Sequence, residues 1–202
     1  GIHFDYIRYP NRDLCYCDGC RERFQQQTGH TVTGWPMQCY NGSLQDEYSQ
    51  WRQDQITRLV RNVSDAVTSR SLDVKISAAV FRNYPNCRYY VGQDWVLWAR
   101  EGYVDFLCPM DYMDSRTAFA KQVELQMELA GEYVPLHPGI GVMASNSNLT
   151  PAQAISQIKA ARDAGAGGFV LFNLNEMLAT EHIPAMGLGV TGPAGGTRFM
   201  AW

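Results

Sequence analysis

Short apolar segments alternate along this chain with longer segments of helical periodicity, and this alternation limits the possible folds more than any other feature. The apolar segments are rich in β-branched and aromatic residues and stop at turn signals such as Pro10 and Pro109. Strands of this kind are buried on both faces and occur in parallel sheets with right-handed crossovers. The sequence therefore predicts an α/β fold with about five parallel strands, over residues 1–6, 74–81, 103–108, 137–142 and 168–173.

Helices are expected between these strands. An apolar stripe with helical spacing runs from Tyr48 to Val67, and two further helices are predicted over residues 93–100 and 115–130. Gly131 is expected to end the second of these as a left-handed cap.

The last crossover helix carries the clearest local signals. Thr150-Pro151-Ala152-Gln153 supplies an N-cap, a proline at the first helical position and a capping-box glutamine for a helix to Ala164. Residues 11–44 are expected to form a long loop, and the chain from Pro184 onward to be irregular. We therefore predict one domain over residues 1–190 and an irregular tail over 191–202.

Two architectures fit this alternation, an open doubly wound sheet and a (β/α) barrel. Asp5, Asp111, Asn173 and Glu176 lie at or just past the carboxyl ends of different predicted strands, where both architectures place their chemistry. No glycine-rich dinucleotide or phosphate-binding motif follows any strand, so the doubly wound nucleotide-binding fold lacks its usual signature. The barrel is favoured.

Composition excludes several classes of partner. With 17 basic and 20 acidic residues the net charge is −3, so no strong field of one sign points to nucleic acid. The apolar runs are far shorter than the ~20 residues that a membrane span needs. Because the chain opens on Gly1 rather than Met, any signal peptide is expected to lie upstream. The aromatic content of 12% is typical of clefts that bind rings through their apolar faces.

Three of the six cysteines are close together, as Cys15, Cys17 and Cys20. Their C-x-C-x2-C spacing suits zinc if a fourth ligand comes from elsewhere, but no second CxxC or H-x3-H is near. A disulfide that involves Cys39, in an oxidising compartment, and free thiols are the alternatives. We expect no metal and no cofactor.

The segment Phe4-Asp5-Tyr6-Ile7-Arg8-Tyr9-Pro10 resembles the fourth-strand motif of the glycosyl-hydrolase-like 10 family. The cysteine cluster, Val91-Gly92-Gln93-Asp94-Trp95, the Pro109-Met110-x-Tyr112 strand end and the Gly167-Gly168-Phe169 strand are similar too, so the resemblance covers nearly all of residues 1–190.

This resemblance implies a (β/α)8 TIM barrel of which the chain holds strands 4–8, with three upstream strand-helix units absent. It also implies a secreted or periplasmic bacterial glycoside hydrolase whose substrate is an oligo- or polysaccharide. Many family members have a second Asp after the first, where this chain has Tyr6. That departure leaves open which carboxyl partners Asp5.

Glycosidic hydrolysis needs one protonated carboxyl and one ionised carboxyl. Asp5 is the first candidate, as nucleophile or base, with Arg8 expected to hold it ionised; a structural Asp5–Arg8 salt bridge is the alternative. Asp111, flanked by apolar groups that would raise its pKa, is a candidate general acid or else a helix N-terminal carboxylate. Glu176 is the reserve acid, with a plain loop residue as the alternative. Asp94 and Asp114 are interpreted as helix N-terminal residues.

Further side chains are candidates for the sugar cleft, since aromatic rings stack on sugars and amides bind hydroxyls. Packing in the core or at the rim is the alternative for each of them. His3 and His137 are interpreted as core histidines. The cleft candidates besides Arg8 are Tyr9, Trp95, Tyr112, Asn173 and Asn175.

Two functions follow from this pattern, an O-glycosidase acting on a polysaccharide or cell-wall glycan, and a carbohydrate-binding barrel without catalysis. Two carboxyls across one cleft would favour the enzyme, whereas a lone Asp5 locked by Arg8 would favour binding. An isomerase or aldolase is a weaker third possibility, because no convincing lysine ends a strand.

Overall fold

The structure, a computed structural model, describes residues 1–191. It is a mixed α/β fold in which parallel strands alternate with helices, as predicted. The strands are β1 (Ile2–Phe4), β2 (Ile76–Val80), β3 (Phe106–Pro109), β4 (Gly139–Gly141), β5 (Met143–Ala144), β6 (Ser147–Asn148) and β7 (Val170–Phe172). The helices are α1 (Asp18–Thr28), α2 (Met37–Tyr40), α3 (Gln45–Ser69), α4 (Asn86–Val91), α5 (Trp95–Arg100), α6 (Arg116–Ala130), α7 (Pro151–Asp163), the π-helical turn η1 (Leu178–His182) and α8 (Ile183–Gly187).

The long strands pair in chain order. β1, β2 and β3 form one parallel sheet, and β4 pairs in parallel with β7. The two pieces are joined by a parallel bridge between Leu107 and Leu136, where the His137 N–H donates to the Leu107 carbonyl at 2.8 Å. Five consecutive parallel strand segments thus lie side by side, which matches the predicted number.

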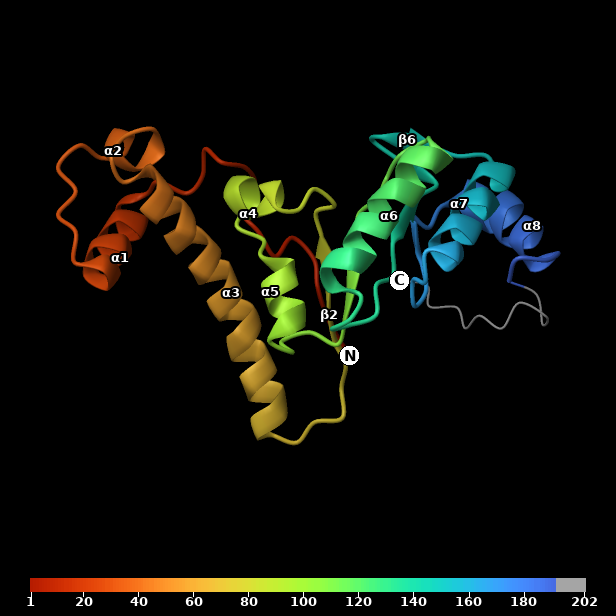
Figure 1. The fold of residues 1–202 in the computed structure, drawn as a ribbon, viewed down its shortest axis with the longest axis horizontal. Helices are drawn as coiled ribbons and strands as arrows, with labels where there is room; N and C mark the ends of the chain where they lie inside the picture. The colour runs from red at the N-terminus through yellow and green to blue at the C-terminus, as the bar shows by residue number, and fades with distance from the viewer. Residues whose placement is uncertain (192–202) are drawn as a thin grey trace.

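The helices cover one face of these strands. In Figure 1, α3, α5, α6 and α7 follow one another across the molecule in chain order. Because successive side chains of a strand point to opposite faces, alternate strand residues pack under the helices. The residues on this face include Ala78, Val80, Leu107 and Ile140, all fully buried in two apolar clusters. The opposite, uncovered face carries the cleft described below.

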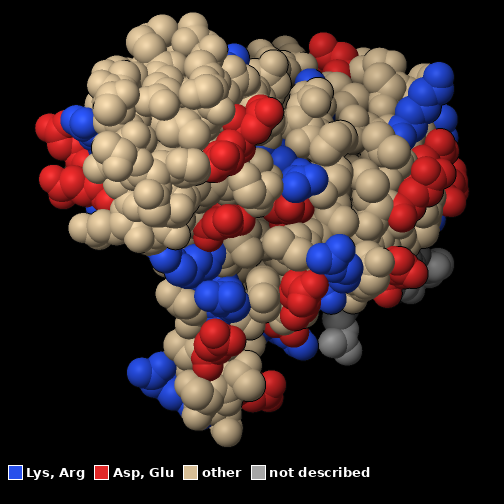
Figure 2. Space-filling model, turned by 60° about the vertical axis from the view of Figure 1, so that its left-hand side comes forward, with Lys and Arg blue, Asp and Glu red and all other residues tan. Residues whose placement is uncertain are grey.

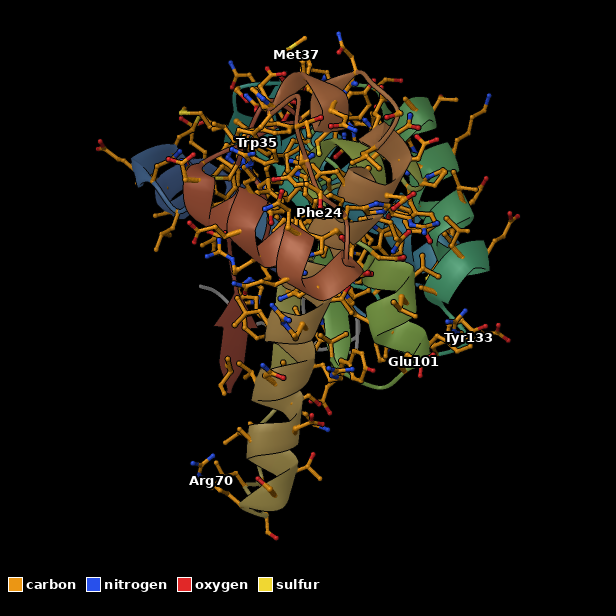
Figure 3. The ribbon with its side chains drawn as sticks, turned by 90° about the vertical axis from the view of Figure 1, so that its left-hand side faces the viewer. Phe24, Trp35, Met37, Arg70, Glu101 and Tyr133 are labelled. Atoms are coloured by element: carbon orange, nitrogen blue, oxygen red, sulfur yellow. The ribbon has the colours of Figure 1, made fainter. Side chains whose placement is uncertain are left out.

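The segment between β1 and β2 is more ordered than a loop. It contains α1 and α2, so the prediction of a long loop over residues 11–44 was wrong. Figure 3 shows Phe24, Trp35 and Met37 around one end of α3, with Arg70 at the other end. These helices pack on α3 through a separate small core, built from Cys20, Phe24, Val32, Cys39, Leu44, Tyr48 and Trp51.

Several local predictions can be compared with the structure. The capping box at Thr150 is present, and the Asp94 carboxyl accepts a bond from the Leu97 N–H as a helix N-cap. Gly131 has a right-handed φ of −64°, so the left-handed cap predicted there was wrong. Glycine is needed at this position because a Cβ would lie 2.6 Å from the Met127 carbonyl oxygen.

The end of the chain also differs from the prediction. The segment after Pro184 was expected to be irregular, but α8 extends to Gly187. Residues 192–202, most of the predicted tail, lie outside the described part of the chain. Acidic and basic side chains are interspersed on the face shown in Figure 2. Within residues 1–191, no helix is both long and apolar enough to cross a membrane.

We expect Leu107→Ala to lower the free energy of unfolding by about 2–5 kcal/mol, because it opens a cavity where β3 joins the two halves of the sheet. Leu59→Ala on α3 is the matched control, since that side chain is 51% exposed and should change stability by less than about 0.5 kcal/mol. Urea denaturation measures both values. Equal losses in the two variants would contradict this assignment of the core.

Candidate active site

The uncovered face of the sheet holds a cleft of about 660 Å³. All five parallel strand segments contribute to it, either within the strand or just past its carboxyl end. The face within the strands is formed by small or apolar residues, Ala79, Cys108, Gly139, Val170 and Leu171, and by His3. The rim is formed by Asp5, Tyr6, Arg8, Phe81, Arg82, Asn83, Met110, Tyr112, Ala144, Ser145, Asn146, Phe172, Asn173 and Leu174.

Asp5 is the only carboxyl among the described residues that line this cleft. It follows β1 directly and is exposed, and its Oδ1 accepts a hydrogen bond from the Tyr6 N–H at 2.8 Å. Tyr6 itself has a φ of +52°, a left-handed conformation that costs a non-glycine residue of order 1–3 kcal/mol. The strained turn aims the Asp5 carboxyl and the Tyr6 ring at the rim of the cleft.

Arg8 lines the cleft but forms no ion pair with Asp5. Its guanidinium lies 4.7 Å from the centre of the Tyr6 ring and 4.8 Å from that of the Phe81 ring, in cation–π contacts. One of its N–H groups also donates to the Tyr9 carbonyl at 3.2 Å. The structural Asp5–Arg8 salt bridge, which the sequence left as the alternative, is therefore absent, and the Asp5 carboxylate is open to the cleft.

His3 is a cleft residue that the sequence reasoning assigned to the core. Its Nδ1 lies 2.8 Å from the Ser77 Oγ, and the half-buried ring faces the cleft two residues before Asp5. Burial lowers the pKa of His3, and the nearby Asp5 carboxylate partly opposes that shift. The alternation of β1 provided a signal, because residues 3 and 5 of a strand point to the same face.

Tyr112 and Phe172 form an aromatic surface within the cleft. Their rings stack with centres 4.9 Å apart at an interplanar angle of 15°. Burial raises the pKa of Tyr112 above its ordinary value, and the Asp5 carboxylate raises it further. Asn173, which also lines the cleft, accepts a 3.0 Å hydrogen bond from the Asn175 amide. The cleft thus combines a carboxylate, a protonated phenol, an amide and a flat apolar surface.

Asp111 lies outside the cleft. Its neighbours Met110 and Tyr112 line the cleft, whereas the Asp111 carboxyl is fully buried and accepts a 2.8 Å bond from Gln126 of α6. Its Oδ2 has no hydrogen-bond partner. Burial raises the pKa of Asp111 to about 8, which keeps the group protonated at neutral pH. That is the pKa expected of a general acid, but the group is on the helix-covered side.

The remaining candidates lie apart from the cleft lining. Glu176 is exposed beyond β7, and the Asn175 side-chain oxygen accepts a 2.8 Å hydrogen bond from the Leu178 N–H at the start of η1. Trp95 is fully buried and donates to the Phe81 carbonyl at 3.0 Å. Tyr9 packs beneath the Arg52 guanidinium. For Trp95 and Tyr9 the structure therefore shows packing roles, which the sequence had left as the alternative.

Within residues 1–191, the one group of three or more clustered potential metal ligands is Cys15, Cys17 and Cys20, and none of these lines the cleft. All six cysteines, Cys39 included, are free thiols.

The family model for Glycosyl hydrolase-like 10 matches residues 1–144. The chain belongs to this family. The match spans β1 to β5 and thus includes Asp5, Arg8 and Tyr112. A search of curated proteins returned no match.

A solved structure supports the fold of this Glycosyl hydrolase-like 10 chain. This chain is similar to the glycoside hydrolase domain of PgaB (BpsB) from Bordetella bronchiseptica, with a TM-score of 0.71 and 12% sequence identity. The similarity covers 93% of this chain and 55% of that domain, so the chain spans little more than half of the domain's length.

We expect Asp111→Asn to stabilise the protein at pH 8 and to have a much smaller effect near pH 4. Between its ordinary pKa of 3.8 and about 8, Asp111 ionises in the unfolded chain but stays protonated in the folded one. The free energy of unfolding therefore falls as pH rises through this window, and the asparagine removes that contribution. Urea denaturation at both pH values measures the difference, with Asp65→Asn on the exposed side of α3 as control. An equal effect of Asp111→Asn at both pH values would contradict the raised pKa.

Proposed function

We propose that this chain forms the catalytic side of a glycoside hydrolase and that Asp5 is a catalytic carboxylate. The observation that carries the proposal is the position of Asp5, an exposed carboxylate at the rim of the cleft that forms no ion pair with an arginine or lysine within residues 1–191. Membership of a glycosyl hydrolase-like family supports it. An unpaired carboxylate of this kind is suited to attack an anomeric carbon or to activate water.

The other cleft residues suggest how a sugar would be held. The stacked rings of Tyr112 and Phe172 offer an apolar face to a pyranose ring, and Asn173 and Asn83 offer hydrogen bonds to hydroxyls. The guanidinium of Arg82 is fixed by a 2.7 Å bond to the Tyr112 carbonyl. Held in this way, it can bind a polar substituent of the substrate without moving. The substrate we propose is an oligo- or polysaccharide, including cell-wall glycans.

A second carboxyl is needed for hydrolysis, and the cleft lining described here supplies none besides Asp5. We propose that the five parallel strands are strands 4–8 of a (β/α)8 TIM barrel and that further strands outside this chain complete the cleft. The 55% coverage of the PgaB domain supports this arrangement. The proton donor then comes from that part of the barrel, or from Glu176 if its loop closes over the substrate. From the family resemblance we propose that the protein is secreted or periplasmic in a bacterium.

A non-catalytic carbohydrate-binding barrel is the second candidate, and one observation favours it. Tyr6 occupies the position after Asp5 where many family members have a second Asp, and it contributes an exposed ring to the cleft instead of a carboxyl. A protein of this kind would bind the same glycan without turnover.

We expect Asp5→Asn to lower kcat for glycan hydrolysis by about 10²-fold or more, with little change in KM, because the amide cannot act as nucleophile or base. Glu124→Gln is the matched control, because this exposed carboxyl of α6 lies outside the cleft lining and its loss should leave kcat unchanged. Release of reducing ends from cell-wall polysaccharides by the full-length protein measures both. Undiminished turnover in Asp5→Asn would remove Asp5 from the mechanism, and binding without turnover in the wild type would favour the second candidate.

Phe172→Ala tests the aromatic surface. We expect it to weaken glycan binding roughly 5- to 10-fold, which corresponds to about 1 kcal/mol for the loss of one stacking face. Leu188→Ala, an exposed apolar residue outside the cleft, should leave binding unchanged. Calorimetry with an oligosaccharide ladder measures the affinities. If both variants bind like the wild type, the sugar does not lie on this surface.

A further inference from the structure

The three thiols of Cys15, Cys17 and Cys20 converge at one point of the small core on α3. Their sulfur atoms all lie within 4.8 Å of one another. Three thiolates bound to one tetrahedral zinc ion are roughly 3.8 Å apart, given a Zn–S bond of about 2.3 Å. Small shifts of the side chains would therefore bring all three sulfurs to bonding distance of a single ion. We propose that these cysteines bind one Zn²⁺ ion through three thiolates, with water as the fourth ligand.

Two of the ligands are fixed by α1. Cys17 is the N-cap residue of the helix, and the N–H groups of Cys20 and Arg21 donate to its carbonyl at 3.0 and 3.1 Å. Cys20 lies in the first turn and is buried in the small core. The positive end of the helix macrodipole stabilises negative charge near this turn, which suits a zinc–thiolate complex with a net negative charge.

The third ligand is fixed by α3. The hydroxyl of Tyr48 donates to the Cys15 carbonyl at 2.6 Å, and Arg52 donates to the carbonyl of Leu14 directly before it. Both side chains are buried, with exposures of 0% for Tyr48 and 2% for Arg52. Two separate helices thus hold the three cysteines in place, so the site is organised before any ion binds.

Charge is also balanced at this point. Zinc binding releases three thiol protons to solvent and leaves a complex with a net charge of −1. Arg23 supplies a positive charge next to it, since its Nη2 donates to the Cys20 sulfur at 3.3 Å. Outer-shell partners of this kind orient metal ligands and raise affinity. Cys17 is exposed, so the fourth position faces solvent and admits a water molecule.

A disulfide explains the cluster less well. A disulfide between two of the three thiols leaves the third unpaired, and Cys39 does not belong to the group of converging cysteines. Cys39 is instead buried in the small core with the aromatic rings. The ion would tie the segment after Arg8 to α1, and so would hold the loop that follows the proposed catalytic strand.

The test compares the purified full-length protein with two variants. Cys17→Ser removes the exposed ligand, and Cys39→Ala is the matched control because it removes a thiol from the same core without touching the cluster. We expect one zinc per chain in the wild type and in Cys39→Ala, measured by elemental mass spectrometry after dialysis. Cys17→Ser should bind Zn²⁺ more weakly by at least the roughly 10- to 100-fold known for the loss of an outer-shell partner.

Two further measurements separate zinc from its alternatives. Co²⁺ added to the metal-free protein should give a thiolate-to-metal charge-transfer band that Cys17→Ser reduces, and Zn²⁺ should raise the melting temperature of the wild type more than that of Cys17→Ser. Circular dichroism shows whether Cys17→Ser is folded. Free thiols without bound metal, a chain mass two hydrogens lower from a disulfide among Cys15, Cys17 and Cys20, or full zinc retention in folded Cys17→Ser would each overturn the proposal.

Discussion

The parallel pairing of five consecutive strand segments determines where every candidate side chain of this protein lies. Pairing fixes the register, and register fixes which residues face the helices and which face the cleft. His3 and Asp5 share the cleft side, while Phe4 between them packs against the main core. The Leu107–Leu136 bridge matters most, because it aligns β1 to β3 with β4 and β7 and so brings Asp5 and Phe172 to one cleft.

The same alternation explains which site residues the sequence could reveal. The place of Asp5 at the cleft could be predicted because this residue follows a short strand and precedes a proline-bounded turn. Asp111 was misleading, since a strand that is apolar on both sides does not show which of its residues point inward. The structure places Met110 and Tyr112 in the cleft and therefore directs Asp111 toward Gln126. Trp95 was a cleft candidate because it is aromatic and follows a strand, but an aromatic residue at such a position can also pack in the core. There the Trp95 indole N–H donates to the Phe81 carbonyl.

The segment between β1 and α3 shows why some helices could not be predicted from the sequence. Helix α1 is polar apart from Cys20 and Phe24, so its own periodicity is too weak to predict it. Its stability comes from rings contributed by α3, where Phe24 meets Tyr48 edge-to-face with ring centres 5.1 Å apart. Such contacts span more than twenty residues of sequence and are invisible to a local pattern. Part of the aromatic content that suggested a sugar cleft is in fact used in this small core.

The uncovered face of the sheet exposes large aromatic side chains in the cleft. Tyr6 and Phe172 are 75% and 42% exposed there, and large apolar groups gathered on one concave surface generally meet a partner. In the function proposed above, a sugar ring would cover this surface with its own apolar face and would present its hydroxyls to Asn83 and Asn173. The strained φ of Tyr6 is consistent with this role, because the turn that holds Asp5 at the rim is maintained although another conformation would be less costly. Tyr6 therefore contributes its ring to the cleft, and its backbone conformation holds the Asp5 carboxylate at the rim.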